Sequence, residues 1–216
     1  MPPTIVLATA AIIGLAAVVL TPWMRRVAGT DSDWLGSGLH SVLAGIGAAG
    51  AATLARDWAE LAAFAVLALA SALLVVIDLA AYRLPDIIVA PTYPILFAGL
   101  TVAAAISGDW DGLGRAAMAS GILALGYLVL ALITPAGLGL GDVKLAGLLG
   151  AFLGWLGWQH TIIGTLAAFT LSGVVAIVLL LGTRATRRTA FPFGPCMIVG
   201  AAIGAAWGPT LIAGTG

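Results

Sequence analysis

Charged residues are scarce in this sequence of 216 residues: they make up 8% of it, whereas hydrophobic residues make up 62%. A soluble domain has about 25% charged and about 45–50% apolar residues. A chain of this size cannot hide so much apolar surface in a core, so the composition excludes an ordinary soluble domain and predicts a lipid environment. The formal net charge is zero, which gives no basis for nucleic-acid binding.

Cysteine and histidine are also scarce. The one cysteine, Cys196, excludes an intramolecular disulfide and a cysteine-rich zinc site, and we expect it to be an inert buried residue. The two histidines, His40 and His160, lie far apart and have no ligand-like spacing. We interpret His160 as an interfacial loop residue rather than a base, and we expect no metal and no cofactor.

Positive charge is lacking before the first apolar stretch, residues 4–20. A secretory signal carries basic residues ahead of its apolar part, but here Arg25 and Arg26 come after it. We interpret this stretch as a first membrane helix with its N-terminus outside, and not as a cleaved signal.

The sequence predicts an all-α, polytopic membrane protein, because eight stretches suit a helix of about 17–25 apolar residues. These stretches are residues 3–22, 39–55, 59–81, 87–107, 113–133, 143–158, 161–182 and 194–213. The second is weakly hydrophobic, and the sixth is short enough to be re-entrant. The longest polar connection, residues 23–38, leaves no room for a soluble domain, so we predict a single membrane-embedded domain over residues 1–216.

The distribution of lysine and arginine predicts the orientation, because cytoplasmic loops carry an excess of both. With the N-terminus outside, the cytoplasmic face receives Arg25, Arg26, Arg83, Lys144, Arg184, Arg187 and Arg188. The outer face receives only Arg56 and Arg115. This bias predicts that both termini are outside and that residues 135–144 are cytoplasmic. Trp58, Trp110 and Trp158 fall near predicted outer ends, as interfacial tryptophans do.

Most acidic residues fall in predicted loops, where we interpret them as solvated charges: Asp31, Asp33, Asp57, Glu60, Asp109 and Asp111. Asp78 instead closes the apolar run of the third stretch, near its cytoplasmic end. One interpretation is an interfacial acid paired with Arg83; the other is a functional acid, since ionisable groups within a span usually face a cavity or a partner.

Asp142 begins the sixth stretch and follows alternating glycines, Gly137, Gly139 and Gly141. A helix N-cap explains the aspartate by itself. It does not explain the glycines, which permit unusual backbone conformations and the close approach of another chain.

The predicted topology places Asp78 and Asp142 in different spans but at the same membrane face. Two carboxylates that meet share a proton, because like charges in a poor dielectric cannot both ionise. The charged member then deprotonates a water, and the neutral member donates a hydrogen bond to a scissile carbonyl. This is the chemistry of an aspartic protease, which needs no cofactor.

Three segments carry a resemblance to a known family. "GLGD" at 139–142 matches the G-x-G-D signature of intramembrane-type aspartic proteases. "DLAAYRLPD" at 78–86 and "FPFGPCMIVGA" at 191–201 resemble segments of the type IV prepilin peptidases. The resemblance covers residues 59–215. Presenilin and signal peptide peptidase share G-x-G-D but carry a late Pro-Ala-Leu motif, so "PFGP" favours the prepilin branch.

The resemblance implies that Asp78 and Asp142 are the catalytic pair. It implies a multi-pass enzyme of the inner (plasma) membrane that works in type IV pilus assembly or protein secretion. The substrate is the helix of a prepilin or pseudopilin, which is cut at the cytoplasmic face after a glycine, beside the lipid bilayer.

The connection at residues 23–38 departs from many bacterial members. Those carry a cytoplasmic insert there with two Cys-x-x-Cys pairs, and they N-methylate the new N-terminus with S-adenosylmethionine. Here the connection is short and has no cysteine, and the usual Gly-Ser-Phe-Leu-Asn segment is missing. The chain resembles minimal members that act only as peptidases, so we predict no methyltransferase activity.

Further residues of these segments have both structural and functional interpretations. Pro85 and Asp86 fit the start of the fourth span, with Asp86 favoured as its N-cap over a direct role. Lys144 is either a tuner of Asp142 or an anchor at the positive-inside face. Gly194 and Pro195 form either a turn or a loop beside the substrate groove.

Small residues at intervals of four predict helix packing rather than chemistry: Gly150 and Gly154, then Gly200, Gly204 and Gly208.

Two other functions remain open at the level of sequence. The first is a small transporter in which Asp78 and Asp142 relay protons, although the chain has no convincing internal repeat of the kind transporters often show. The second is a structural membrane subunit, which needs no acid pair. Two carboxylates facing each other near a cytoplasmic groove would favour the protease.

Overall fold

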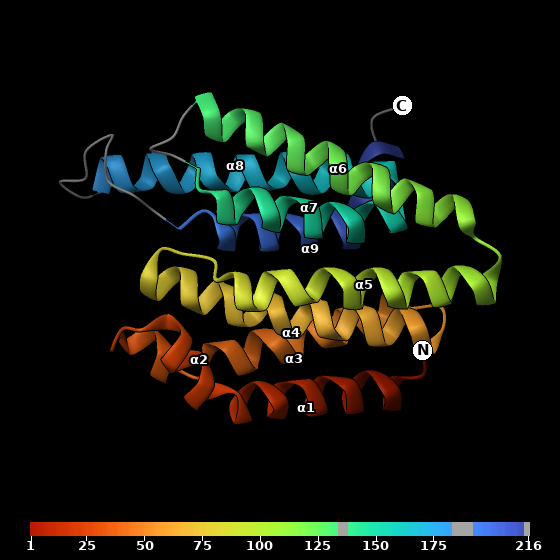
Figure 1. Cartoon of the computed structure of the whole chain (residues 1–216), viewed down its shortest axis with the longest axis horizontal. Coiled ribbons are helices and arrows are strands. Elements are labelled where there is room, and N and C mark those ends of the chain that lie inside the picture. The colour runs from red at the N-terminus through yellow and green to blue at the C-terminus, as the bar shows by residue number, and fades with distance from the viewer. Residues whose placement is uncertain (134–137, 183–191, 214–216) are drawn as a thin grey trace. The chain divides into compact units, whose positions relative to one another are not determined.

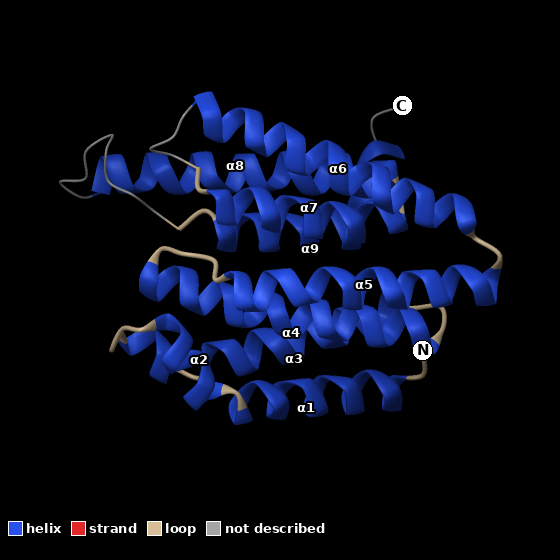
Figure 2. Ribbon diagram, viewed as in Figure 1, coloured by secondary structure: helices blue, strands red, loops and turns tan. Residues whose placement is uncertain are grey.

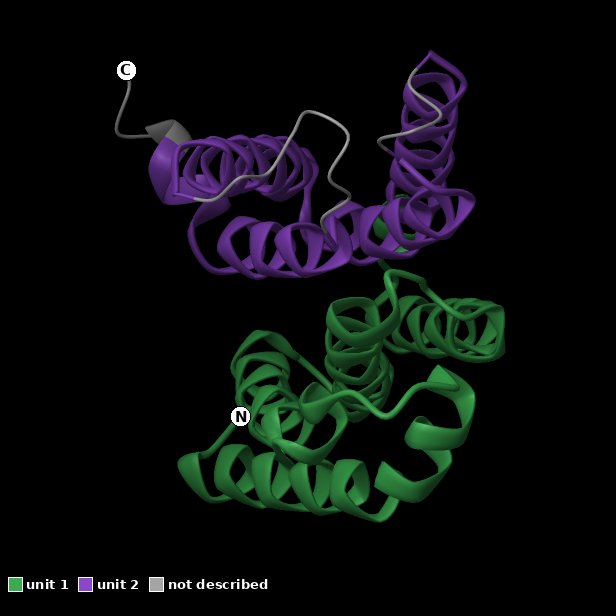
Figure 3. Ribbon diagram, turned by 90° about the vertical axis from the view of Figure 1, so that its left-hand side faces the viewer, with its two compact units in different colours: residues 1–113 green, residues 114–216 purple. Residues whose placement is uncertain are grey.

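The computed structural model of the chain is all-α, and it describes residues 1–133, 138–182 and 192–213 (Figures 1 and 2). No strand occurs in these ranges, as the composition predicts. The chain divides into two compact units, residues 1–113 and 114–216, which Figure 3 colours separately. Each unit is described by itself below.

Each of the eight predicted stretches contains one helix. The helices are α1 (Pro3–Val19), α2 (Thr21–Ala28), the short 3₁₀ helix η1 (Asp33–Gly36), α3 (Leu39–Leu54), α4 (Trp58–Ala81), α5 (Asp86–Ser107), α6 (Trp110–Ile133), α7 (Leu140–Leu156), α8 (Trp158–Gly182) and α9 (Gly194–Ala213). Among the described helices, α2 and η1 were not predicted: α2 begins at the end of the first predicted stretch and continues into the connection at residues 23–38, where η1 also lies.

Five helices of the described chain are long and apolar enough to cross a membrane by themselves: α4, α5, α6, α8 and α9. The pair α1 and α2 would form a sixth span, but it bends by 52° at Leu20. Pro22 lies two residues later, and a proline has no N–H for the helical ladder, which explains the break. Helices α3 and α7 have only 16 and 17 residues, in agreement with the weak second and short sixth predictions.

Helix α4 is the core of the first unit. In its most apolar stretch of 18 residues, 78% of the residues are buried. The elements that pack against α4 are α1, α2, η1, α3 and α5. Asp57 caps its N-terminus by accepting hydrogen bonds from the N–H groups of Ala59 and Glu60 at 2.8 and 2.9 Å. The run that follows is rich in alanine and leucine, which have high helix propensity.

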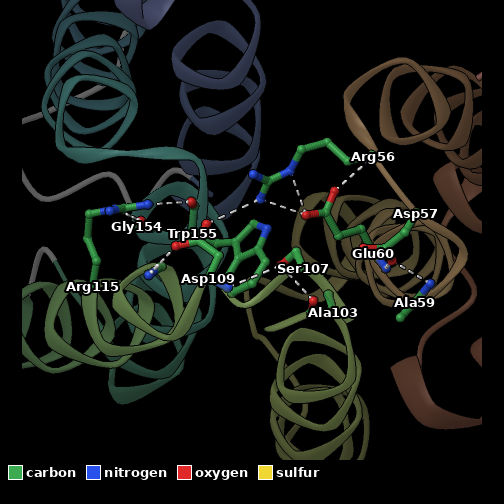
Figure 4. Close-up of polar contacts among 11 residues, drawn as sticks. Arg56, Asp57, Ala59, Glu60, Ala103, Ser107, Asp109, Arg115, Gly154 and Trp155 are labelled. Carbon is green, nitrogen blue, oxygen red and sulfur yellow. Dashed lines mark hydrogen bonds and ion pairs between the residues drawn. The ribbon is translucent and has the colours of Figure 1, made fainter. Parts of the chain in front are cut away.

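The prediction that Glu60 is a solvated loop charge is wrong. Glu60 lies in the first turn of α4 with 2% of its surface exposed. Arg56 donates to it from its side chain at 2.7 Å and from its backbone N–H at 2.7 Å (Figure 4). A second carboxylate, Asp109, lies 3.6 Å from the same guanidinium. The hydrogen bond that Arg56 donates to Glu60 is the main cause that raises the pKa of Arg56, because a buried carboxylate stabilises a cation beside it.

The second unit is built on glycine contacts. A Cβ at Gly204 of α9 would lie 2.5 Å from the Cα of Gly164 in α8. A Cβ at Gly200 would likewise lie 2.5 Å from the backbone nitrogen of Ala168. In α7, a Cβ at Gly150 would lie 2.7 Å from the carbonyl oxygen of Ala119 in α6, and a Cβ at Gly154 would lie 2.5 Å from the Cβ of Ala119. The prediction that these small-residue repeats pack helices is therefore confirmed.

His160 differs from its prediction as a loop residue. It lies in the first turn of α8, and its Nδ1 donates to the carbonyl oxygen of Gly204 in α9 at 2.8 Å. Since a carbonyl only accepts, this bond fixes the proton on Nδ1. Cys196 is buried at the start of α9, as predicted.

Candidate active site

Asp78 lies in the last turn of α4 with 4% of its surface exposed. Its carbonyl oxygen accepts the N–H of Tyr82 at 2.9 Å, and this bond closes the helix. Tyr82 ends α4 in the left-handed region, with φ 52°. A non-glycine residue adopts this conformation only where the surroundings enforce it, so the segment after Asp78 is held in a defined path.

Arg83 contacts the backbone of α2. Its Nη2 atom donates to the carbonyl oxygens of Val27 and Ala28, both at 2.7 Å. These contacts join the chain just after Asp78 to a helix more than fifty residues earlier. The guanidinium of Arg83 thus binds the end of α2, and its pairing with Asp78 stays an interpretation.

Pro85 and Asp86 begin α5, one position away from the prediction. Pro85 takes the N-cap position, with φ −71° and ψ 132°, and no side chain caps this helix end. Asp86 is the first helical residue and is exposed. The N-cap prediction for Asp86 is therefore wrong by one residue, although its charge still lies in the first turn, where it favours the helix dipole.

Asp142 is the third residue of α7, not its N-cap. Gly139 takes the N-cap position, and its N–H donates to Asp142 Oδ2 at 2.9 Å. A carboxylate three residues into a helix commonly reaches back in this way to the capping residue. Asp142 is half-buried, and burial raises its pKa, while the bond from Gly139 opposes that rise.

The glycines around Asp142 are not explained by an unusual backbone. Gly139 has φ −91° and ψ 164°, which any residue adopts, and Gly141 is helical. A Cβ at Gly139 would make only an ordinary contact with Asp142, at 3.6 Å. Gly137 lies outside the described residues. The other reason for these glycines, the close approach of a second chain, stays a prediction.

Three further candidate residues lie near the starts of α7 and α9. Lys144 is exposed in the second turn of α7. Gly194 and Pro195 are the first two residues of α9, where a proline fits because its missing N–H has no partner in a helix anyway. Gly194 is buried, so these two residues form the start of a packed helix. A role of either residue beside the substrate stays a prediction.

An aromatic cluster in the second unit was missed by the sequence analysis. It consists of Tyr127 from α6, Phe169 from α8 and Phe193 just before α9, with ring centroids 5.4 to 6.1 Å apart. The cluster thus joins the "PFGP" segment to α6 and α8. The one signal in the sequence was Phe193, which lies within that segment.

The two aspartates belong to different units of the structure, and each has neighbours from its own unit. Asp78 and Arg83 belong to the first unit, and Asp142, Tyr127 and Phe193 belong to the second. The meeting of the two carboxylates stays a prediction. No group of three or more histidine, cysteine, aspartate or glutamate residues that could hold a metal occurs in the described part of the chain.

Comparison with known proteins links both aspartates to one family. The model of the type IV leader peptidase family matches residues 65–181, a range that contains Asp78 and Asp142. A prepilin leader peptidase/N-methyltransferase of Aeromonas hydrophila is 35% identical over 169 residues, which cover 74% of this chain and 54% of that protein. A protein of the same name from Pseudomonas putida is 36% identical over 135 residues, 60% of this chain and 44% of its own.

The chain therefore spans about half the length of the curated relatives it matches. No solved structure matches it.

Proposed function

Because this chain belongs to the type IV leader peptidase family, we propose that it is a membrane aspartic endopeptidase that removes the leader of type IV prepilins or pseudopilins. The observation that carries this proposal is the family match over residues 65–181, which includes both Asp78 and Asp142. Its relatives are named for leader peptidase activity, and the apolar helices of the chain suit a substrate that is itself embedded in a membrane.

Asp78 and Asp142 form the catalytic pair in this proposal. The ionised carboxylate takes a proton from a water molecule, whose oxygen bonds to the carbonyl carbon of the scissile peptide. The carbonyl oxygen takes the proton of the other carboxyl group, giving a tetrahedral diol. The diol then collapses: the C–N bond breaks, the amine leaves with a proton, and the leader keeps the new carboxyl group.

The surroundings of the aspartates suit a pair that shares a proton. Burial raises the pKa of Asp142, and Asp78 is buried as well. Since coupled carboxylates titrate as a unit, the activity should follow two apparent pKa values that belong to the pair.

Cleavage takes place at the cytoplasmic face of the inner membrane in this proposal, with the N-terminus of the enzyme outside. The uneven distribution of lysine and arginine supports this orientation. Asp86 and Lys144 are exposed beside the two catalytic segments, where charged side chains could contact lipid phosphates or the polar leader.

The proposed activity is that of a peptidase alone. Residues 23–38 contain most of α2, a short loop and η1, and they contain no cysteine. The relatives are named N-methyltransferases as well, so the two activities need separate measurements.

Co-expression with a candidate prepilin tests the proposal. In a host without another such enzyme, the prepilin should lose its leader and migrate faster on a gel when this protein is present. The product should begin at the residue after the cleaved glycine. A prepilin that stays full length, while a known leader peptidase cuts it in the same host, would contradict the proposed function.

A further inference from the structure

A side chain from the connection between α4 and α5 donates hydrogen bonds to the C-terminal end of α2. The last carbonyls of a helix have no partner within the helix. At α2, the carbonyls of Val27 and Ala28 both accept from Arg83 Nη2 at 2.7 Å. Gly29 then ends the helix with φ +65°, and a Cβ at Gly29 would lie 3.4 Å from the same nitrogen. The guanidinium therefore lies closely against the end of α2, where a cation also favours the helix dipole.

The same arginine lies just beyond the last turn of α4, which carries Asp78. Tyr82, between them, has φ 52° and donates its N–H to the Asp78 carbonyl at 2.9 Å. The last turn of a helix frays unless it is held by other contacts. Arg83 supplies such a contact two residues after Ala81, the last residue of the helix, so the position of Asp78 depends on the position of α2.

Helix α2 is itself held in place, because it packs against α4. Met24 and Ala28 of α2 are 0% and 3% exposed, and Leu35 of η1 is 1% exposed. Both α2 and η1 contact α4. Arg25 of α2 donates in turn to the carbonyl of Leu35 at 3.4 Å. Residues 21–36 thus pack against α4 within the first unit, and Arg83 joins them to the end of α4 that carries Asp78.

We propose that Arg83 is a positioning residue: its two hydrogen bonds to the end of α2 hold the last turn of α4, and with it Asp78, in the geometry that catalysis needs. This inference rests on the proposed function. Catalytic rates are sensitive to such placement, since a displacement of about 1 Å can lower a rate about 100-fold.

Arg83→Met tests the inference, because methionine keeps much of the apolar stem and removes every donor. We expect kcat for prepilin cleavage to fall about 10- to 100-fold, with KM changed less than about threefold, because substrate binding does not depend on the exact position of one carboxylate. Arg83→Lys keeps a cationic donor on a differently shaped stem, so it should recover part of the loss.

Arg115→Met is the matched control. Arg115 also donates to two carbonyls at a helix end, those of Gly154 and Trp155 in α7, at 2.7 and 3.0 Å (Figure 4). Gly154 is three turns along α7 from Asp142, about 18 Å at 1.5 Å per residue. Arg115→Met should lower the thermal stability of the detergent-solubilised protein by a similar amount, while kcat stays within about twofold of the native value.

Three results would overturn the inference. The first is an Arg83→Met enzyme with normal kcat while Asp78→Asn is inactive; this result leaves the proposed function intact. The second is an equal fall in kcat for Arg83→Met and Arg115→Met, which would indicate general destabilisation. The third is full activity of Asp78→Asn, which would reject the proposed catalytic pair and the role of Arg83 with it.

Gly29→Ala supplies the test from the other side of the contact if Arg83→Met does not accumulate. Its φ of +65° is strained for alanine, so the end of α2 must shift relative to Arg83. The expected result is again a lower kcat with KM nearly unchanged, and normal kcat in both Gly29→Ala and Arg83→Lys would contradict the inference.

Discussion

Glu60 and Asp78 are both buried acids of α4, with 2% and 4% of their surface exposed, but they lie at opposite ends of the helix. Glu60 forms an ion pair with Arg56 at 2.7 Å and secures the first turn. Asp78 lies in the last turn, before a residue with a left-handed backbone. A buried acid is thus no evidence of chemistry by itself, and the family match is what separates the two.

Replacement of either aspartate by asparagine should abolish cleavage while the protein still inserts and accumulates. Asparagine keeps the size and can donate a hydrogen bond, but it cannot take a proton from water. The double variant should be no worse than the single ones, because residues that act as a unit lose most activity with the first change. A gel assay of leader loss, with immunoblots for the amount of enzyme, measures both.

The alternative interpretations predict another outcome. If Asp142 only stabilises the start of α7, and Asp78 is only an interfacial acid, each variant should keep its activity and lose about 0.5–2 kcal/mol of stability. A well-expressed Asp78→Asn protein with near-normal cleavage would reject the catalytic pair. Loss of proton-coupled transport in place of proteolysis would favour the transporter.

The stability contributed by Asp142 should depend on pH. Burial raises its pKa in the folded protein, so the folded state binds this proton more tightly than the unfolded state does. The contribution is fully present below the ordinary pKa of an aspartate and is lost as the pH rises through the raised value. Thermal unfolding in detergent should therefore show the native protein losing stability relative to Asp142→Asn as the pH rises. Asp111→Asn replaces an exposed acid in the first turn of α6 and is the control. If the native protein lost the same stability relative to Asp111→Asn as the pH rises, the assignment of the pH dependence to Asp142 would be contradicted.

Glycine residues allow paired helices of the second unit to approach each other closely. Helices α8 and α9 approach so closely that Gly204 leaves no space for a Cβ beside Gly164. The same approach brings the Nδ1 of His160 within 2.8 Å of the Gly204 carbonyl. Without a hydrophobic driving force between helices in lipid, such close packing and polar contacts hold them together.

Gly204→Ala should destabilise the second unit by about 1–3 kcal/mol, because the added methyl group forces the two backbones apart. Gly173→Ala is the matched control in α8, since a Cβ there meets nothing within 4 Å. Alanine also has the higher helix propensity, so the control should be neutral or slightly stabilising. Thermal unfolding followed by circular dichroism distinguishes the two, and equal melting temperatures would show that the contact at Gly204 is not tight.

The whole chain combines two compact units, residues 1–113 and 114–216, with a family match that extends into both. The proposed catalytic pair takes one aspartate from each unit, so neither unit is expected to cleave a prepilin by itself. The tryptophans at the starts of α4, α6 and α8 are exposed, at 66%, 56% and 41%. That these three ends lie at one membrane interface stays a prediction.

Reporter fusions should place Gly137 in the cytoplasm and Gly108 outside. Gly108 ends α5, whereas Gly137 lies outside the described residues and is assigned from the sequence alone. A pair of reporters that are active only in the cytoplasm or only outside it measures both positions. If both positions were on the same side, the predicted topology and the shared membrane face of the aspartates would be rejected.

Pilin processed by this protein alone should carry an unmethylated N-terminus. The short segment at residues 23–38 has no cysteine, and it packs as α2 and η1 against α4. Mass spectrometry of the mature pilin, from a host without another leader peptidase, measures the modification. An added methyl group would show that methyl transfer does not need the cysteine-rich insert, and co-expression with a methylating relative provides the positive control.

The sequence by itself determined the helices. A backbone in lipid must satisfy its own hydrogen bonds, so long apolar runs form helices whatever surrounds them, and all eight runs are helical. The "GLGD" and "DLAAYRLPD" segments also indicated the family from the sequence, because a local motif can be recognised without knowing how the helices pack.

Only the tertiary structure decided the contacts between distant residues. The burial of Glu60, the bend between α1 and α2, the bonds of Arg83 to Val27 and Ala28, and the cluster around Tyr127 were not predicted. Each depends on which helix packs against which, because a side chain finds its partner through space and not along the chain. Hydropathy fixes the length of a helix in a membrane, but the shapes of facing side chains fix its neighbours.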